Sequence, residues 1–292
     1  MFSEIKLVNI ELKPNNLLLR IGTGIIFVAV LLGSIFYNRY SYAIVLGMVQ
    51  ILALTEFYGL IQERTGTSIS KYLNILGGIF LFAGLFMFFS GINNSLLVLT
   101  PYIFYFLVLF ISELYLKRPD PIKSLAYSVL GQIYIAVPFS LLNYMAFNYA
   151  PDNSYHYAYI LAIFLFIWAN DSFAYLFGVT LGKHKMFERI SPKKSWEGFA
   201  GGAICTIGIS LAFAHYFGSL PVWGWMGFAA VVVASGTLGD LVESLFKRTL
   251  NVKDSGTMLP GHGGILDRFD SMIFAIPSVF VYLEIIKAID RL

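Results

Sequence analysis

Long hydrophobic stretches recur along most of the chain, and short polar segments separate them. A helix of about 17 to 25 apolar residues crosses the hydrocarbon core of a bilayer, and about nine of the stretches are that long. They lie near residues 17–36, 40–61, 72–90, 97–116, 124–147, 157–179, 199–217, 223–239 and 272–289. The pattern therefore predicts an all-α, polytopic integral membrane protein with about nine transmembrane helices.

The composition excludes a soluble globular domain. Of the 292 residues, 58% are hydrophobic and 13% are charged, whereas charged residues make up about a quarter of soluble domains. The first stretch has no A-x-A-like exit, so we expect it to remain as a helix and not to be a cleaved signal peptide. Glycines within the stretches would let neighbouring helices approach closely. We therefore expect helix contacts at Gly22, Gly77, Gly78, Gly201 and Gly202.

Basic residues are distributed unevenly between the two sides that this topology defines. If the N-terminus lies inside, seventeen of the twenty Lys and Arg residues fall on the inner side, and Arg39, Lys287 and Arg291 fall outside. Because basic loops stay in the cytoplasm, we expect a cytoplasmic N-terminus. The two largest polar stretches, residues 181–198 and 240–270, then face the cytoplasm, where nucleoside triphosphates are found.

No compositional break or flexible linker divides the chain, so we expect a single membrane domain over residues 1–292. Residues 1–150 are expected to form a helical scaffold, and residues 157–292 are expected to carry the chemistry. No internal repeat is evident, whereas inverted-repeat transporters show matching interrupted helices in two halves. The lopsided distribution of polar residues therefore argues against a transporter.

Acidic and basic residues are concentrated between residues 239 and 270, beside two hydrophobic stretches. At helical spacing, Asp240, Glu243 and Lys247 share one face, and Asp267 and Asp270 share a face at the start of the last helix. Carboxylates without a set of Cys or His residues suit a hard cation such as Mg²⁺. Asp240 and Asp267 are the first candidates for its ligands.

The segment Pro-Gly-His-Gly-Gly at residues 260–264 lies between these acids. Gly263 and Gly264 would let backbone N–H groups approach an anion closely. His262 would suit a phosphate contact or general-acid assistance to a leaving group. The alternative is a turn residue whose side chain is satisfied by the backbone.

The other polar stretch, residues 182–198, holds five basic residues against two acids. Lys193 and Lys194 follow Pro192 just before a hydrophobic helix, where they could reach triphosphate oxygens or a lipid headgroup. The alternative is ordinary anchoring of a basic loop at an anionic membrane surface.

Asp171 lies within an otherwise apolar segment. Because an unpaired carboxylate in a membrane costs several kcal/mol, such a residue indicates a functional site. The alternative is a structural hydrogen bond to Asn170, Ser172 or a neighbouring helix.

At these residues the chain resembles the phosphatidate cytidylyltransferases, also called CDP-diacylglycerol synthases. The motifs that carry the resemblance have fixed spacing and span roughly the last 120 residues. Ser195 stands where the family has Thr, which keeps the hydroxyl group. The motifs are Asp171–Tyr175, Ser191–Gly198, Ser244-x-Phe-Lys-Arg248, Lys253-Asp-Ser-Gly256, Pro260–Gly264 and Asp267-Arg-Phe-Asp270.

The resemblance implies a polytopic multi-pass fold in the cell membrane, an active site facing the cytoplasm, Mg²⁺ dependence with a second cation left open, and a homodimer. It implies CTP and phosphatidate as substrates and no nucleic-acid partner. Asp240 and Asp267 would be catalytic metal ligands, with Asp171 and Asp270 as further candidates. The resemblance also implies catalytic roles for Lys253 and His262, and substrate contacts from Lys193, Lys194, Lys247, Arg248, Asp254, Gly263, Gly264 and Arg268.

In the implied reaction, a phosphatidate oxygen attacks the α-phosphorus of CTP, and pyrophosphate leaves, giving CDP-diacylglycerol for phospholipid biosynthesis. The nucleophile is already anionic near neutral pH, so catalysis depends on positioning and electrostatics. A related lipid or polyprenol kinase remains an alternative, which nucleotide preference would distinguish. A CDP-alcohol phosphotransferase is excluded, because its motif needs Asp-Gly dipeptides and the chain has none.

Overall fold

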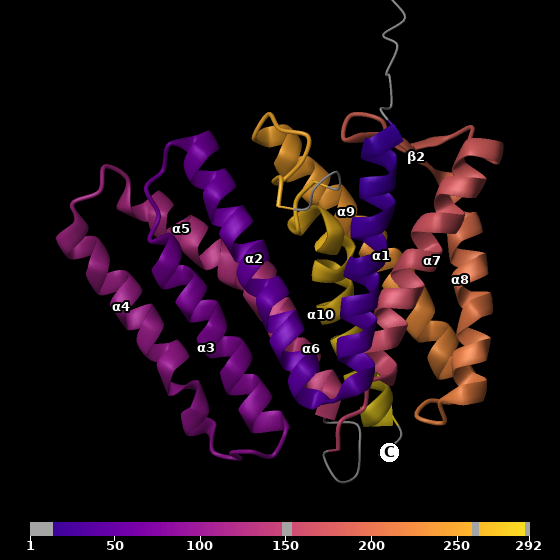
Figure 1. Ribbon diagram of the computed structural model, residues 1–292, viewed down its shortest axis with the longest axis horizontal. Coiled ribbons are helices and arrows are strands. Elements are labelled where there is room, and N and C mark those ends of the chain that lie inside the picture. The colour runs from indigo at the N-terminus through magenta and orange to yellow at the C-terminus, as the bar shows by residue number, and fades with distance from the viewer. Residues whose placement is uncertain (1–13, 148–153, 259–262, 290–292) are drawn as a thin grey trace, which may run out of the picture.

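The computed structural model describes residues 14–147, 154–258 and 263–289 (Figure 1). Nearly all of this chain is helical, and one short two-stranded sheet interrupts it. The elements are α1 (Pro14–Tyr37), α2 (Arg39–Thr65), α3 (Lys71–Phe89), the 3₁₀-helix η1 (Leu96–Leu99), α4 (Thr100–Leu116), α5 (Pro121–Gly131), the π-helix η2 (Gln132–Ala136), α6 (Val137–Phe147), α7 (Ala158–Leu181), β1 (Lys185–Phe187), β2 (Ser191–Ser195), α8 (Trp196–Tyr216), α9 (Val222–Thr249) and α10 (Leu266–Ile289).

Each of the hydrophobic stretches seen in the sequence coincides with a helix or with a continuous run of helices. Within the described residues, eight helical segments are long and apolar enough to cross a membrane. The described part of α1 adds a shorter apolar helix, Gly22–Tyr37. The prediction of an all-α, polytopic membrane protein is confirmed, whereas the count of nine crossings stays a prediction.

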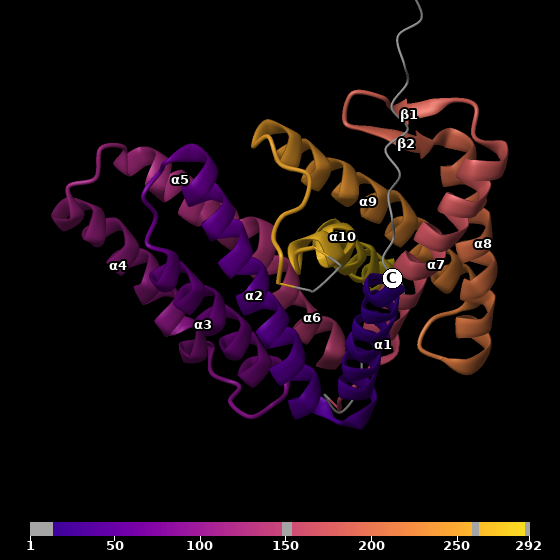
Figure 2. The same cartoon turned by 45° about the horizontal axis from the view of Figure 1, so that its top comes forward.

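The helices form two groups that meet along α6 and α10 (Figures 1 and 2). One group contains α2 to α6, and the other contains α7 to α10, with α7, α8 and α9 packed closely together. The helix α1 contacts both α2 and α7. The fold therefore brings the middle of the chain against its last helix.

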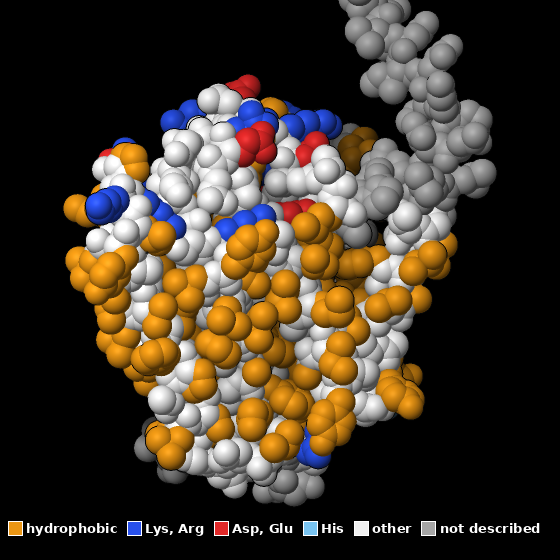
Figure 3. Space-filling view, turned by 60° about the vertical axis from the view of Figure 1, so that its left-hand side comes forward, with side chains coloured by type: hydrophobic (Ala, Val, Ile, Leu, Met, Phe, Trp, Pro, Cys, Tyr) orange, Lys and Arg blue, Asp and Glu red, His pale blue; other side chains and the backbone are white. Residues whose placement is uncertain are grey.

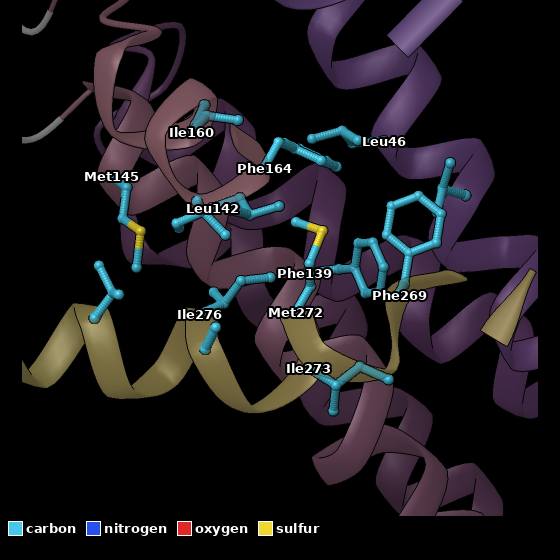
Figure 4. Packing of buried hydrophobic residues seen from close by; sticks show 14 of the residues in the cluster. Leu46, Phe139, Leu142, Met145, Ile160, Phe164, Phe269, Met272, Ile273 and Ile276 are labelled. Atoms are coloured by element: carbon cyan, nitrogen blue, oxygen red, sulfur yellow. The ribbon is translucent and has the colours of Figure 1, made fainter. Parts of the chain in front are cut away.

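The core at this junction is made of large apolar side chains from both groups (Figure 4). Phe269 of α10 belongs to this core and is 1% exposed, with its ring 5.9 Å from that of Phe27, 5.5 Å from that of Phe139 and 6.2 Å from that of Phe164. Burial of such a ring stabilises a structure by about 1.5–3 kcal/mol. Because Asp267 and Asp270 flank Phe269, this packing also fixes the start of α10.

The outer surface matches a lipid environment (Figure 3). Hydrophobic side chains cover most of the visible face, and Lys, Arg, Asp and Glu gather at one end of the helices. In the segment Leu96–Leu116, which comprises η1 and α4, only 11% of the most apolar stretch is buried. Most of this segment therefore faces outward. Since lipid replaces water around these helices, exposed apolar residues do not require a protein partner here.

Several polar side chains of the first group form hydrogen bonds between its helices. Gln132 of the π-helix donates from Nε2 to the carbonyl oxygen of Asn74 at 2.7 Å and to the hydroxyl of Tyr58 at 3.2 Å. Tyr58 in turn donates to the carbonyl oxygen of Ser128 at 2.7 Å. These bonds join α2 and α3 to the helical run that contains η2.

The prediction that glycines lie where helices approach closely holds at four of the five positions. A Cβ atom at Gly77 would lie 2.7 Å from the Tyr105 ring, and one at Gly78 would lie 2.5 Å from Leu54. Gly201 and Gly202 face α7 in the same way. At Gly22 no described atom lies within 4 Å of the Cβ position, so the prediction is wrong there.

Candidate functional site

The basic loop of the sequence forms a β-hairpin against the start of α8. Strands β1 and β2 are antiparallel, with Lys185 opposite Ser195. Glu197, in the first turn of α8, accepts hydrogen bonds from the backbone N–H groups of Lys183 at 3.1 Å and His184 at 3.2 Å. Ser195 caps α8 by accepting the N–H of Gly198 at 3.2 Å. These bonds fix both the residues before β1 and the end of β2 against the first turn of α8.

A cavity of about 210 Å³ lies between this hairpin and α7, α8 and α9. Lys193 and Lys194 line it from β2, Asp171 lines it from α7, and Asp240 lines it from α9. The amine of Lys194 lies 2.7 Å from Oδ2 of Asp240 and 3.4 Å from the carbonyl oxygen of Thr237. Four residues from three separate segments of the sequence therefore meet in one cavity.

Three carboxylates from different helices interact at this position. The negative charges of Asp171 of α7, Asp240 of α9 and Asp270 of α10 disfavour one another electrostatically. Ser244 donates a hydrogen bond to Oδ1 of Asp240 at 3.2 Å, and the backbone N–H of Ser271 donates to Asp270 at 2.6 Å. The arrangement favours a positive group between the helices, and Lys194 is one such group.

Among the described residues, no three acidic, His or Cys side chains are grouped as ligands of one metal ion. Mg²⁺ commonly takes only one or two carboxylates and completes its shell with water and substrate phosphates. Carboxylates at an open cavity beside two lysines fit that requirement.

A second ionic cluster joins α9 to the start of α10. The amine of Lys247 lies 2.5 Å from Oε2 of Glu243 and 2.7 Å from Oδ1 of Asp267. Asp267 also accepts the backbone N–H of Ser255 at 2.9 Å and that of Gly264 at 2.9 Å. Asp240 and Asp267, the two metal ligands that the sequence predicts, therefore have different lysine partners here, and a shared ion stays a prediction.

The loop between α9 and α10 borders a larger opening of about 750 Å³. Lys253, Asp254 and Gly263 line it from the loop, and Arg64 lines it from α2. Gly263 has φ +84°, a conformation that side-chain-bearing residues rarely adopt. Lys253, with its predicted catalytic role, and the predicted substrate contacts Asp254 and Gly263 are thus brought together at one opening.

The remaining predicted residues differ in their surroundings. Arg248 and Arg268 are exposed, near the end of α9 and the start of α10 respectively. Gly264 is buried, and its backbone N–H bonds Asp267. His262 lies outside the described residues, so its predicted role stays a prediction.

An apolar crevice of about 150 Å³ adjoins the second cluster. Its walls come from the polar ends of α2, α5 and α9, and include Phe57, Tyr127 and Phe246. Lys247 and Ser255 also line it. The crevice thus combines apolar walls with charged groups on one side.

Sequence reasoning missed Glu56, a buried residue of α2. Its carboxylate accepts a hydrogen bond from the backbone N–H of Leu266, the first residue of α10, at 2.9 Å. The signal that could have found it is a carboxylate within an apolar helix, the same signal that singled out Asp171.

The fold and the site define a polytopic membrane protein with a basic and acidic pocket at one end of its helices. A model of the cytidylyltransferase family matches residues 18–286, and the chain belongs to this family.

Curated relatives carry a more specific name. A phosphatidate cytidylyltransferase of Staphylococcus aureus (strain COL) is 43% identical over 159 residues, which cover 54% of this chain and 58% of the relative. One of Staphylococcus epidermidis is 50% identical over 127 residues, covering 43% of this chain and 48% of the relative. The matched part of the chain therefore spans about half the length of these relatives.

Proposed function

We propose that the protein is a phosphatidate cytidylyltransferase, which forms CDP-diacylglycerol and pyrophosphate from CTP and phosphatidate. The observation that carries the proposal is the cavity in which Lys193 and Lys194 meet Asp171 and Asp240 at the polar end of the helices. It offers cations for phosphate oxygens and carboxylates for a metal ion in one place. The name of the relatives supports the same reaction.

The residues bind and orient two anionic substrates. A phosphatidate oxygen forms a bond to the α-phosphorus of CTP, and the bond from that phosphorus to the bridging oxygen breaks as pyrophosphate leaves. Because the nucleophile is already an anion, no strong base is needed, and the barrier is lowered by alignment and by dispersal of charge. Lys193 and Lys194 neutralise phosphate charge, and Lys253 approaches from the loop between α9 and α10.

Asp240 and Asp267 would hold Mg²⁺, and Asp171 and Asp270 are further candidates. The mutually unfavourable negative charges of Asp171, Asp240 and Asp270 support a cation in this region. When bound, Mg²⁺ would neutralise charge on the phosphates of CTP. A second cation remains open.

The apolar crevice supports a lipid substrate. Its lining by Phe57, Tyr127 and Phe246 suits an acyl chain, and Lys247 lies beside it. We place the polar end of the helices at the cytoplasmic face of the cell membrane, where CTP is available. The proposed homodimer rests on the family resemblance.

The test is pyrophosphate release by purified protein in micelles that contain phosphatidate. CTP and ATP are compared, with Mg²⁺ and with EDTA, for the unmodified protein and for Asp267→Asn. We expect turnover with CTP and Mg²⁺ only, and a loss of at least about 100-fold in Asp267→Asn. Turnover with ATP in place of CTP would favour the kinase, and a folded Asp267→Asn variant with full activity would remove this residue from the site.

A further inference from the structure

Glu56 is an ionisable side chain of α2, in the first group of helices, and it is far in sequence from the site residues. It belongs to the candidate span Arg39–Thr65 and is 7% exposed. A carboxylate buried in a membrane helix is costly and is retained where it has a partner or a function. The first group of helices is therefore more than a scaffold at this position.

The carboxylate points at the loop between α9 and α10, which bends toward α2 (Figure 2). Oε2 accepts the backbone N–H of Leu266 at 2.9 Å and the hydroxyl of Ser255 at 3.4 Å. Oε1 is buried and has no hydrogen-bond donor among the described residues. The bonds at Oε2 hold the side chain against the described part of the loop.

The loop backbone is fitted closely around this carboxylate. A Cβ atom at Gly256 would lie 2.5 Å from Oε1 of Glu56, and one at Gly264 would lie 2.6 Å from Oε2. Both distances are shorter than a van der Waals contact, so only glycine fits at these positions without movement. Glu56 therefore sets how deep the loop lies between the two groups of helices.

Glu56 and Asp267 both accept hydrogen bonds from the same two parts of the loop. Asp267 accepts the backbone N–H groups of Ser255 and Gly264, whereas Glu56 accepts the hydroxyl of Ser255 and the N–H of Leu266. Leu266 directly precedes Asp267 in the chain. Any shift of the loop away from Glu56 would therefore move the Asp267 carboxylate.

We propose that Glu56 is a positioning residue, which fixes Ser255 and Leu266 and thereby holds Asp267 and Lys247 at the site. It does not touch substrate. The effect on turnover rests on the proposed function, whereas the effect on the loop can be measured without it.

The experiment compares Glu56→Gln with Glu113→Gln. Glu113 is the matched control, because it is also a buried glutamate of the first group, at 9% exposed, and its partners Arg118 and Ser124 lie away from the loop. Three quantities are measured for each variant: the melting temperature, kcat and KM for CTP, and the rate at which trypsin cleaves after Lys253 in detergent.

We expect Glu56→Gln to lower kcat at least about tenfold with little change in KM, since misplacement of a site residue impairs the reaction more than binding. Cleavage after Lys253 should be at least about threefold faster, because a loosened loop opens more often. Glu113→Gln should lower the melting temperature and leave kcat and cleavage near the unmodified values. Unchanged kcat and cleavage in Glu56→Gln, or equal losses of kcat in both variants, would overturn the proposal.

Gly256→Ala tests the same contact from the loop and decides the question if Glu56→Gln does not fold. Its methyl group would meet the Glu56 carboxylate, so kcat should fall and cleavage should accelerate without a change in α2. A folded Gly256→Ala with normal kcat and cleavage would also overturn the proposal. If the unmodified protein does not use CTP and phosphatidate, the proposed function fails, and the cleavage rates alone still decide the role of Glu56 in holding the loop.

Discussion

Lys194 and Asp240 form an ion pair at the mouth of the cavity, and the two side chains are 26% and 30% exposed. An incoming phosphate would compete with Asp240 for the amine of Lys194. Exchange of one anionic partner for another keeps the lysine paired at each stage. Under the proposed function, this exchange would also leave Asp240 able to hold a metal ion, which would couple nucleotide binding to metal binding.

Replacement of Lys194 by Gln should therefore weaken nucleotide binding. A hydrogen bond between charged groups is worth about 1.5–3 kcal/mol, so KM for CTP should rise by about ten- to a hundredfold. The control is Lys185→Gln, in strand β1 of the same hairpin, because Lys185 does not line the cavity. Steady-state kinetics in mixed micelles would check this, and an equal rise of KM in both variants would show only a general effect of positive charge.

At the residue scale, the sequence predicted contacts within one helix better than contacts between segments. Glu243 and Lys247 are four residues apart, and their ion pair follows from helical spacing. The pairing of Lys194 with Asp240 crosses from a hairpin to a helix, and no local rule predicts it. The types of the site residues were predictable, whereas their partners required the fold.

Helices α7 and α8 pack closely at glycines of α8, and residues of both helices form part of the cavity wall. A Cβ atom at Gly202 would lie 2.6 Å from Oδ1 of Asn170 and 3.0 Å from its carbonyl oxygen. Asn170 directly precedes Asp171 and also lines the cavity. The spacing of α7 and α8 therefore determines where the Asp171 carboxylate lies.

Replacement of Gly202 by Ala should push the two helices apart. Overpacking of this kind costs about 1–3 kcal/mol, so the melting temperature in detergent should fall by several degrees. Gly208→Ala in the same helix is the control, since no described atom lies within 4 Å of its Cβ position. We expect the melting temperature of Gly208→Ala to be close to that of the unmodified protein. Equal melting temperatures for the two variants would contradict the close packing at Gly202.

At the element scale, hydrophobicity located the helices but not their internal breaks. The stretch at residues 124–147 was predicted as one helix, and it contains the π-helix Gln132–Ala136 between α5 and α6. A change of hydrogen-bond register leaves the hydrophobic pattern nearly unchanged, so the sequence could not indicate it. The hairpin was missed for another reason, since its strands are only three and five residues long.

The whole molecule is polar at one end. The hairpin and the α9–α10 loop lie at this end, whereas the loop between α3 and α4 lies at the opposite end (Figure 1). This alternation agrees with the sidedness that the basic residues predict, in which the polar end faces the cytoplasm.

Single cysteines would test the orientation. Cys205 is the sole cysteine and would first be replaced by Ser. Arg189→Cys, in the turn between β1 and β2, should react with a membrane-impermeant maleimide only after the cells are opened. Asn94→Cys, in the exposed loop between α3 and α4, should react in intact cells. The reverse pattern would contradict the predicted orientation, and the Cys205→Ser background should not react in either case.

Glu56 and Leu266, whose hydrogen bond joins α2 to α10, are 210 residues apart in the chain. During synthesis the ribosome completes α2 long before it makes the donor for this carboxylate. The nascent protein therefore carries an acidic group without its final partner while most of its helices are inserted. Docking of α10 supplies that partner, so the site cannot be assembled before α10 has been synthesised and inserted.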